Sequence, residues 1–221
     1  FTYSELVAAI RAACGSGVET KKLAGTWTCT IDVTDRMNAA AEQALGLSAA
    51  DGTAQMPLQL VLTVTEDGAY TLRYDSDAAR TALDAYAAAL RPAAVESVYA
   101  AAEEQGLSRE EYDAAMEKAG ITMDDMVAAI FAGVDEEELL SLLTGRSAAL
   151  TGYCRAEGGQ LYLADTAADL TETADCLSYT LSDGTMTWTD AQGELSSQLT
   201  EQEQELLRVP LTWTKRAEES K

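Results

Sequence analysis

Residues 25–33 read GTWTCTIDV, and this stretch decides how the chain is expected to fold. Trp27, Cys29 and Ile31 alternate with threonine and aspartate, and a period of two is typical of a β-strand with one buried face. We therefore expect a strand that begins at Gly25. Its apolar face meets either a packed core or a pocket that takes a ligand, and the sequence leaves both alternatives open.

The same alternation recurs in seven further segments of the chain. Residues 58–64 and 69–75 flank the turn sequence TEDG and predict a β-hairpin. The C-terminal third contains two more hairpins, with turns at Gly158-Gly159 and Asp183-Gly184, and a last strand at residues 209–215. Threonines occupy most outward positions, which favours an antiparallel sheet with one solvated face. Eight such strands, joined mostly in sequence order, predict a barrel or a sandwich.

Between the two β regions the apolar period changes to about 3.6 residues. A helical stripe is formed by Leu83, Tyr86, Leu90, Ala94, Val98 and Ala102. Pro92 is expected to begin a second helical piece or to kink a longer helix. Capping boxes that start at Ser108, Thr122 and Asp135 then predict short helices separated by glycine stops.

These patterns predict an α+β, mainly β protein. We expect a β portion made of residues 1–75 and 146–221, either a barrel or a sandwich, with an all-helical insertion at residues 76–145 between the third and fourth strands. The capping pattern also occurs at the start of the chain and predicts an N-terminal helix at about residues 3–13. A further short helix is expected at residues 35–45.

Charge and composition exclude several classes of function. The net charge of −22 opposes binding to phosphate backbones and to anionic lipid headgroups. The chain contains no histidine, which excludes Ser-His-Asp and Cys-His catalysis and histidine zinc sites. Cys14, Cys29, Cys154 and Cys176 lack metal-binding spacing. Their even number fits an oxidising compartment as well as buried thiols, so no disulfide is assigned.

A Gly-Thr-Trp that enters the first of eight meandering antiparallel strands resembles the lipocalin and calycin pattern, whose signature is Gly-x-Trp. Gly25 and Trp27 are the matching residues, and the resemblance covers the β regions but not the helical insertion. It implies that the strands close into an eight-stranded antiparallel lipocalin-like barrel. It implies that Trp27 is a structural residue at the closed end of the barrel. It also implies a basic residue over that ring, for which Lys215 and Arg216 are suitably placed.

The chain is also similar to uncharacterised lipocalin-like lipoproteins of anaerobic Gram-positive bacteria, in which acidic helical segments separate the strands. That resemblance implies an extracytoplasmic protein, anchored to the cell membrane by a lipidated cysteine upstream of Phe1. The strong acidity and the lack of an initiator methionine agree with this expectation. The resemblance does not supply a ligand.

Four side chains expected to face the barrel interior are candidate ligand-binding residues: Tyr70, Tyr74, Tyr179 and Trp188. Tyr153 is also expected to face inward. An eight-stranded barrel is either filled by side chains or left with room for one small ligand. Tyrosine hydroxyls in an apolar lining suit a small apolar or amphipathic molecule. We therefore expect a non-enzymatic binding protein, or alternatively a surface protein-interaction module that acts through the acidic helical insertion.

The helical insertion carries fifteen acidic and four basic residues, so a protein partner of this region is expected to be basic. Its acidic clusters are Glu103-Glu104, Asp124-Asp125 and Glu136-Glu137-Glu138. Consecutive helical residues point about 100° apart, so these carboxylates do not converge on one metal ion. No segment matches a calcium-binding loop. We expect no catalytic residues, no metal, no cofactor and no nucleic-acid partner.

Overall fold

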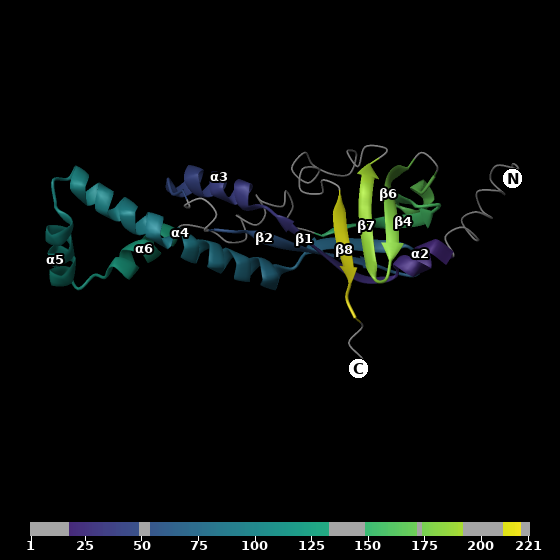
Figure 1. Cartoon of the computed structure of the whole chain (residues 1–221), viewed down its shortest axis with the longest axis horizontal. Helices are drawn as coiled ribbons and strands as arrows, with labels where there is room; N and C mark the ends of the chain where they lie inside the picture. The colour runs from purple at the N-terminus through teal and green to yellow at the C-terminus, as the bar shows by residue number, and fades with distance from the viewer. Residues whose placement is uncertain (1–17, 49–53, 133–148, 172–173, 192–209, 218–221) are drawn as a thin grey trace, which may run out of the picture. The chain divides into compact units, whose positions relative to one another are not determined.

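The computed structural model describes residues 18–48, 54–132, 149–171, 174–191 and 210–217. In chain order the elements are α2 (Val18–Leu23), β1 (Gly25–Asp32), α3 (Thr34–Leu45), β2 (Pro57–Val64), β3 (Ala69–Tyr74), α4 (Ser76–Glu104), α5 (Arg109–Ala119), α6 (Met123–Phe131), β4 (Leu150–Glu157), β5 (Gln160–Ala164), the 3-10 helix η1 (Ala167–Asp169), β6 (Asp175–Ser182), β7 (Thr185–Ala191) and β8 (Leu211–Lys215). The helix predicted at residues 3–13 lies outside the described residues, and α2 is the described helix that precedes β1 (Figure 1).

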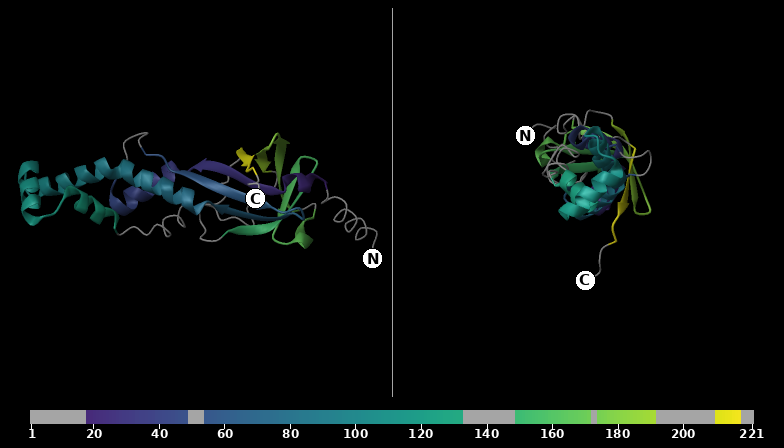
Figure 2. Two further views of the ribbon diagram at one scale, coloured as in Figure 1. Left: turned by 90° about the horizontal axis from the view of Figure 1, so that it is seen from below. Right: turned by 90° about the vertical axis from the view of Figure 1, so that its left-hand side faces the viewer.

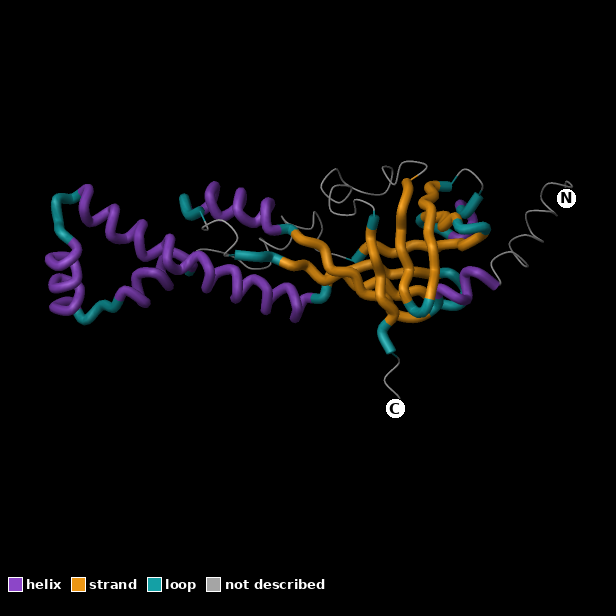
Figure 3. The backbone as a smooth tube through the Cα atoms, in the orientation of Figure 1, coloured by secondary structure: helices purple, strands orange, loops and turns teal. Residues whose placement is uncertain are grey.

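The eight strands close into one antiparallel barrel, in the order β1 to β8 around the sheet. Each strand pairs with its neighbours in sequence, and β8 returns to pair with β1, where Trp27 lies opposite Lys215. The wrapping of the strands can be followed in Figure 3. Of the two architectures that eight alternating strands allow, the chain adopts the barrel, which is consistent with a lipocalin-like fold.

The inner face of the barrel carries the apolar half of the alternation. Directly paired residues on neighbouring strands point to the same side of a sheet, so the register identifies this face. Threonines such as Thr63 and Thr212 lie on the other face and are exposed. The inward side chains that are less than a tenth exposed are Trp27, Cys29, Leu60, Leu62, Val64, Tyr70, Cys154, Ala156, Leu161, Leu177, Tyr179, Met186, Trp188, Leu211 and Trp213.

Strand β4 presents small residues to the interior, so the prediction that Tyr153 faces inward is wrong. Gly152, Cys154 and Ala156 are buried, whereas Tyr153 is half-buried on the opposite face. The cause is limited space, because a Cβ atom at Gly152 would lie 2.9 Å from the ring of Tyr70 on β3. The inward position opposite Tyr70 is therefore restricted to glycine, and this sets which residues of β4 face the interior.

The helices α3 to α6 belong to a second compact unit, Asp32–Leu58 and Ser76–Leu143, while the other unit holds most of the barrel strands. The predicted stripe on α4 is buried along its whole length, and Pro92 lies inside a helix that runs unbroken over 29 residues. Helix α3 confirms the short helix expected at residues 35–45. Figure 2 shows α6 turning back alongside α4, and an ion pair between Arg91 and Asp124 joins these two helices.

Both capping boxes that fall within the described residues form as predicted. At the start of α5, the backbone N–H of Ser108 donates to the Glu111 carboxylate at 3.0 Å, and Ser108 Oγ accepts from the Glu111 N–H. Thr122 and Asp125 make the same reciprocal pair at the start of α6. The box predicted at Asp135 lies outside the described residues. Local sequence therefore determines where α5 and α6 begin.

Candidate functional site

Trp27 is buried between α2 and the end of β8. The indole N–H donates to the carbonyl oxygen of Leu23, the last residue of α2, at 2.7 Å. The Nζ atom of Lys215 lies 5.3 Å from the centroid of the Trp27 ring, so Lys215 is the basic residue that the lipocalin resemblance implies. Helix α2 is itself attached to the barrel, because Thr20 Oγ1 accepts from the backbone N–H of Ala156 on β4 at 3.0 Å.

The contact between Lys215 and the ring of Trp27 requires glycine at position 25. The φ of Gly25, +126°, lies in a region that residues with a side chain rarely adopt. A Cβ atom at this position would also lie only 2.7 Å from Cε of Lys215. The aliphatic stem of Lys215 therefore passes over Gly25 and carries the ammonium group onto the face of Trp27, where a cation is attracted by the ring.

Arg216, the other basic residue expected near Trp27, makes different contacts. Its guanidinium lies 3.1 Å from Asp75 Oδ2 and 3.2 Å from Gln59 Oε1. Its backbone N–H donates to the carbonyl oxygen of Thr26 at 2.8 Å. Arg216 therefore links the end of β8 to β1 through Thr26, to β2 through Gln59 and to Asp75, which directly follows β3.

The four candidate ligand-binding residues fall into two groups on the barrel wall. Tyr179 and Trp188 are directly paired between β6 and β7, and they are 9% and 4% exposed. Tyr70 and Tyr74 both lie on β3, where Tyr70 is buried and Tyr74 is half-buried. Two strands, β4 and β5, lie between β3 and β6. The structure therefore brings Tyr179 and Trp188 together and leaves Tyr70 and Tyr74 on another part of the wall.

Trp213 on β8 completes the group around Trp188, although it was not among the residues predicted to bind a ligand. The centroids of the two indole rings lie 4.8 Å apart. Neither indole Nε1 has a hydrogen-bond acceptor among the described residues, in contrast to that of Trp27. Buried donors are normally paired, so two neighbouring unpaired ones need an explanation. One feature of the sequence could have identified Trp213. Every tryptophan in the chain stands between two threonines, and this alternation places all three tryptophans on inward positions of strands.

Burial favours the uncharged forms of Tyr179, Cys154 and Cys29 on the inner face of the barrel. Desolvation raises the pKa of Tyr179 to about 12, and the carboxylate of Glu19, 3.5 Å from the phenol oxygen, adds to the effect. Burial raises the pKa of the Cys154 thiol to about 12 and that of Cys29 above its usual value. Neither of these two cysteines is in a disulfide. At neutral pH Cys29 and Cys154 are thiols rather than nucleophilic thiolates, and Tyr179 is a neutral phenol.

No family model, curated protein or solved structure matches the chain. Within the described residues, no helix is long and apolar enough to cross a membrane. In the same part of the chain, no three metal-binding side chains come together. The function therefore has to be inferred from the geometry of the barrel and of the helices.

Replacing Trp27 by alanine is expected to lower the free energy of unfolding by roughly 3 to 5 kcal/mol, the range for truncating a buried aromatic side chain. Lys215→Met keeps the stem over Gly25 and removes the charge. This variant should cost only about 0.5 to 1 kcal/mol, because Lys215 is solvent-exposed. Urea unfolding followed by circular dichroism measures both losses. A Trp27→Ala variant of unchanged stability would contradict the structural role of the ring.

The raised pKa of Tyr179 predicts a loss of stability at alkaline pH. The phenol ionises near pH 10 in the unfolded chain but only near pH 12 in the folded protein. Its stabilising contribution is therefore fully present below pH 10 and is lost as the pH rises from 10 to 12. Tyr179→Phe should show a shallower decline in thermal stability across this window. A decline in Tyr179→Phe as steep as that of the unmodified protein would refute the assignment.

Proposed function

We propose that the protein is a non-enzymatic binding protein whose barrel takes a small apolar or amphipathic molecule. The ligand would present a hydrogen-bond acceptor to Trp188 and Trp213. The observation that carries this proposal is the pair of buried indole N–H groups without an acceptor among the described residues. A buried, unpaired donor costs about 1 to 3 kcal/mol, and a ligand oxygen within hydrogen-bond distance of the indole N–H groups would remove that cost.

The neighbours of the two tryptophans favour an uncharged polar group on the ligand. Leu177, Met186 and Leu211 are buried on the same inner face, so the wall around the indoles is apolar. An apolar wall with a few oriented polar groups is the usual composition of a small-molecule site. The net charge of −22 opposes a carboxylate, so a neutral carbonyl oxygen, as in a ketone, an ester or an amide, fits best.

A ketone and its isosteric alkene test this proposal. 2-Octanone has an acceptor oxygen, which 2-methyl-1-octene replaces by a methylene group, so only the ketone should gain from the indole donors. We expect Trp188→Phe and Trp213→Phe each to weaken ketone binding roughly two- to tenfold, the loss for one hydrogen bond. Trp27→Phe is the matched control, because its indole N–H already donates to Leu23. Titration calorimetry measures the affinities.

Equal binding of the ketone and the alkene would contradict the proposal, and so would an equal loss in the Trp27→Phe control. Failure of the ketone to bind at all would favour the other alternative, a barrel filled by its own side chains with ordered water on the two indoles. Native mass spectrometry of the protein purified from its own host would then identify a retained natural ligand by its mass.

A second candidate function is protein recognition through α5. This helix buries none of its residues, and large apolar side chains are exposed on either side of it, with Leu107 38% and Ile121 42% exposed. Its surface is acidic, and Arg109 is already paired with Glu96 and Glu103.

Helix α4 holds α5 in place, because the ring of Tyr112 contacts that of Tyr99 and Asp113 accepts a hydrogen bond from the Tyr99 hydroxyl. The acidic residues of α5 would then meet a basic partner on a helix that is already positioned.

We further propose that the protein lies outside the cytoplasm of a Gram-positive bacterium and is attached to the cell membrane by a lipid. The resemblance of the sequence to acidic lipocalin-like lipoproteins supports this location, as does the strong acidity of the chain.

A membrane-impermeant cross-linker applied to intact host cells tests location and partner together. We expect it to label the chain and to capture a basic protein, which Leu107→Ser/Ile121→Ser should reduce severalfold. Ser97→Ala, on an exposed position of α4, is the control. Labelling only after lysis would refute the location, and unchanged capture by the double variant would refute the role of α5.

A further inference from the structure

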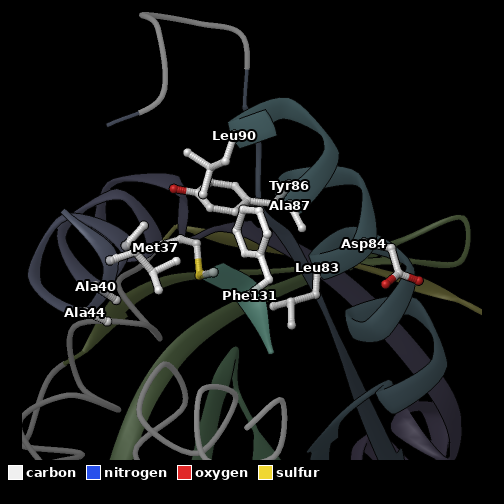
Figure 4. Close-up of a pocket in the computed structure, with 11 residues that line it drawn as sticks. Met37, Ala40, Ala44, Leu83, Asp84, Tyr86, Ala87, Leu90 and Phe131 are labelled. Carbon is white, nitrogen blue, oxygen red and sulfur yellow. The ribbon is translucent and has the colours of Figure 1, made fainter. Parts of the chain in front are cut away.

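A cavity of about 240 Å³ lies among α3, α4 and α6, within the compact unit that these helices form. Its apolar walls include Met37 of α3, Leu83 and Leu90 of α4, and Phe131 of α6. Figure 4 shows these side chains gathered around the ring of Phe131. The lining comes from helices alone, so the cavity is distinct from the inner face of the barrel.

The cavity exists because small side chains stand where the helices meet. Ala40, Ala41 and Ala44 of α3 and Ala87 of α4 are part of its lining. Protein interiors normally contain few voids larger than a water molecule, and an apolar void lowers stability in proportion to its volume. Larger apolar residues at these positions would fill the space, so the alanines keep open a volume that a ligand can occupy.

A hydrogen bond fixes the spacing of two walls of the cavity. The hydroxyl group of Tyr86 on α4 donates to Asn38 Oδ1 on α3 at 2.6 Å. The Tyr86 side chain lines the cavity and is 1% exposed, and this burial raises the pKa of its phenol. The phenol therefore stays a neutral donor at physiological pH. Walls that are already fixed reduce the cost of ordering side chains when a ligand binds.

The size and the charge of the cavity specify a class of ligand. An apolar cavity of about 150 Å³ holds benzene, so this larger one accommodates one aromatic ring with a short chain. Asp84 is the charged residue in its lining, and it is exposed at the edge of the cluster in Figure 4. Asp84 makes no hydrogen bond or ion pair within the described residues. A carboxylate at the edge of an apolar cavity favours a cationic group on the ligand.

We propose that this cavity binds a small hydrophobic amine. The ring of the amine lies against Phe131 and Leu90, and its ammonium group pairs with Asp84. The net charge of −22 raises the local concentration of such a cation, which supports the same class of ligand. This site is independent of the barrel site, because its lining comes from α3, α4 and α6, whereas Trp188 and Trp213 lie on β7 and β8.

Three molecules of the same shape test the proposal on the full chain: 3-phenylpropylamine, the neutral 3-phenylpropanol and the anionic 3-phenylpropanoate. We expect the amine to bind roughly two- to fivefold more tightly than the alcohol, the gain for one exposed ion pair, and the anion to bind most weakly. Asp84→Asn should lower the affinity for the amine to that of the alcohol. Asp77→Asn removes the same charge from α4 outside the cavity and should leave the preference intact.

A second variant locates the ligand. Ala87→Leu fills part of the cavity and should abolish binding of both the amine and the alcohol, while circular dichroism confirms that the protein is folded. The NMR signal of the ¹³C-labelled methyl group of Met37 should shift on addition of the amine in the unmodified protein but not in Ala87→Leu. The proposal is overturned if the amine does not bind, if Asp84→Asn and Asp77→Asn behave alike, or if folded Ala87→Leu binds as before. None of these outcomes bears on ketone binding at the two tryptophans.

Discussion

The pairing of β8 with β1 is the contact on which the barrel depends. It converts a meander of eight strands into a closed sheet and removes the two free edges that an open sheet would expose. Trp27 and Lys215 face each other across this pairing, and Gly25 leaves the space in which their side chains meet. The carbonyl group of Leu23 satisfies the indole and attaches α2 at the same place. The sheet therefore closes at the same place where Trp27 is buried and where α2 is attached to the barrel.

The interior of the barrel is divided between large and small side chains. Tyr70 occupies the space over Gly152, so one part of the wall is filled by a tyrosine from a neighbouring strand. On another part, Trp188 and Trp213 lie against each other with both indole N–H groups unpaired among the described residues. The aromatic residues of these two regions differ in their contacts. The ring of Tyr70 packs against the backbone of Gly152, whereas the indole N–H groups of Trp188 and Trp213 have no acceptor among the described residues. This difference makes the tryptophan pair the stronger candidate for binding.

The helices form a unit of their own that draws on two places in the sequence. Helix α3 follows β1, whereas α4 to α6 follow β3, yet all four belong to one compact unit. The hydrogen bond between Tyr86 and Asn38 and the cavity beside it both require α3 and α4 together. Removing residues 77–144 alone would leave the buried face of α3, with Met37 and Ala41, without its packing partner. The helical insertion is therefore not a simple loop extension of the barrel.

The eight strands, the hairpin turns, the capped helices and the inward position of Trp27 could all be predicted from the amino-acid pattern, because these features depend on short-range periodicity and on local hydrogen bonds. The tertiary structure alone decided that the sheet closes, that Lys215 rather than Arg216 covers Trp27, and that Tyr153 faces outward. It also decided that Trp188 and Trp213 become neighbours and that alanines from α3 and α4 border one cavity. Each of these outcomes depends on which residues from distant segments compete for the same volume, and a periodic pattern in one segment carries no information about that competition.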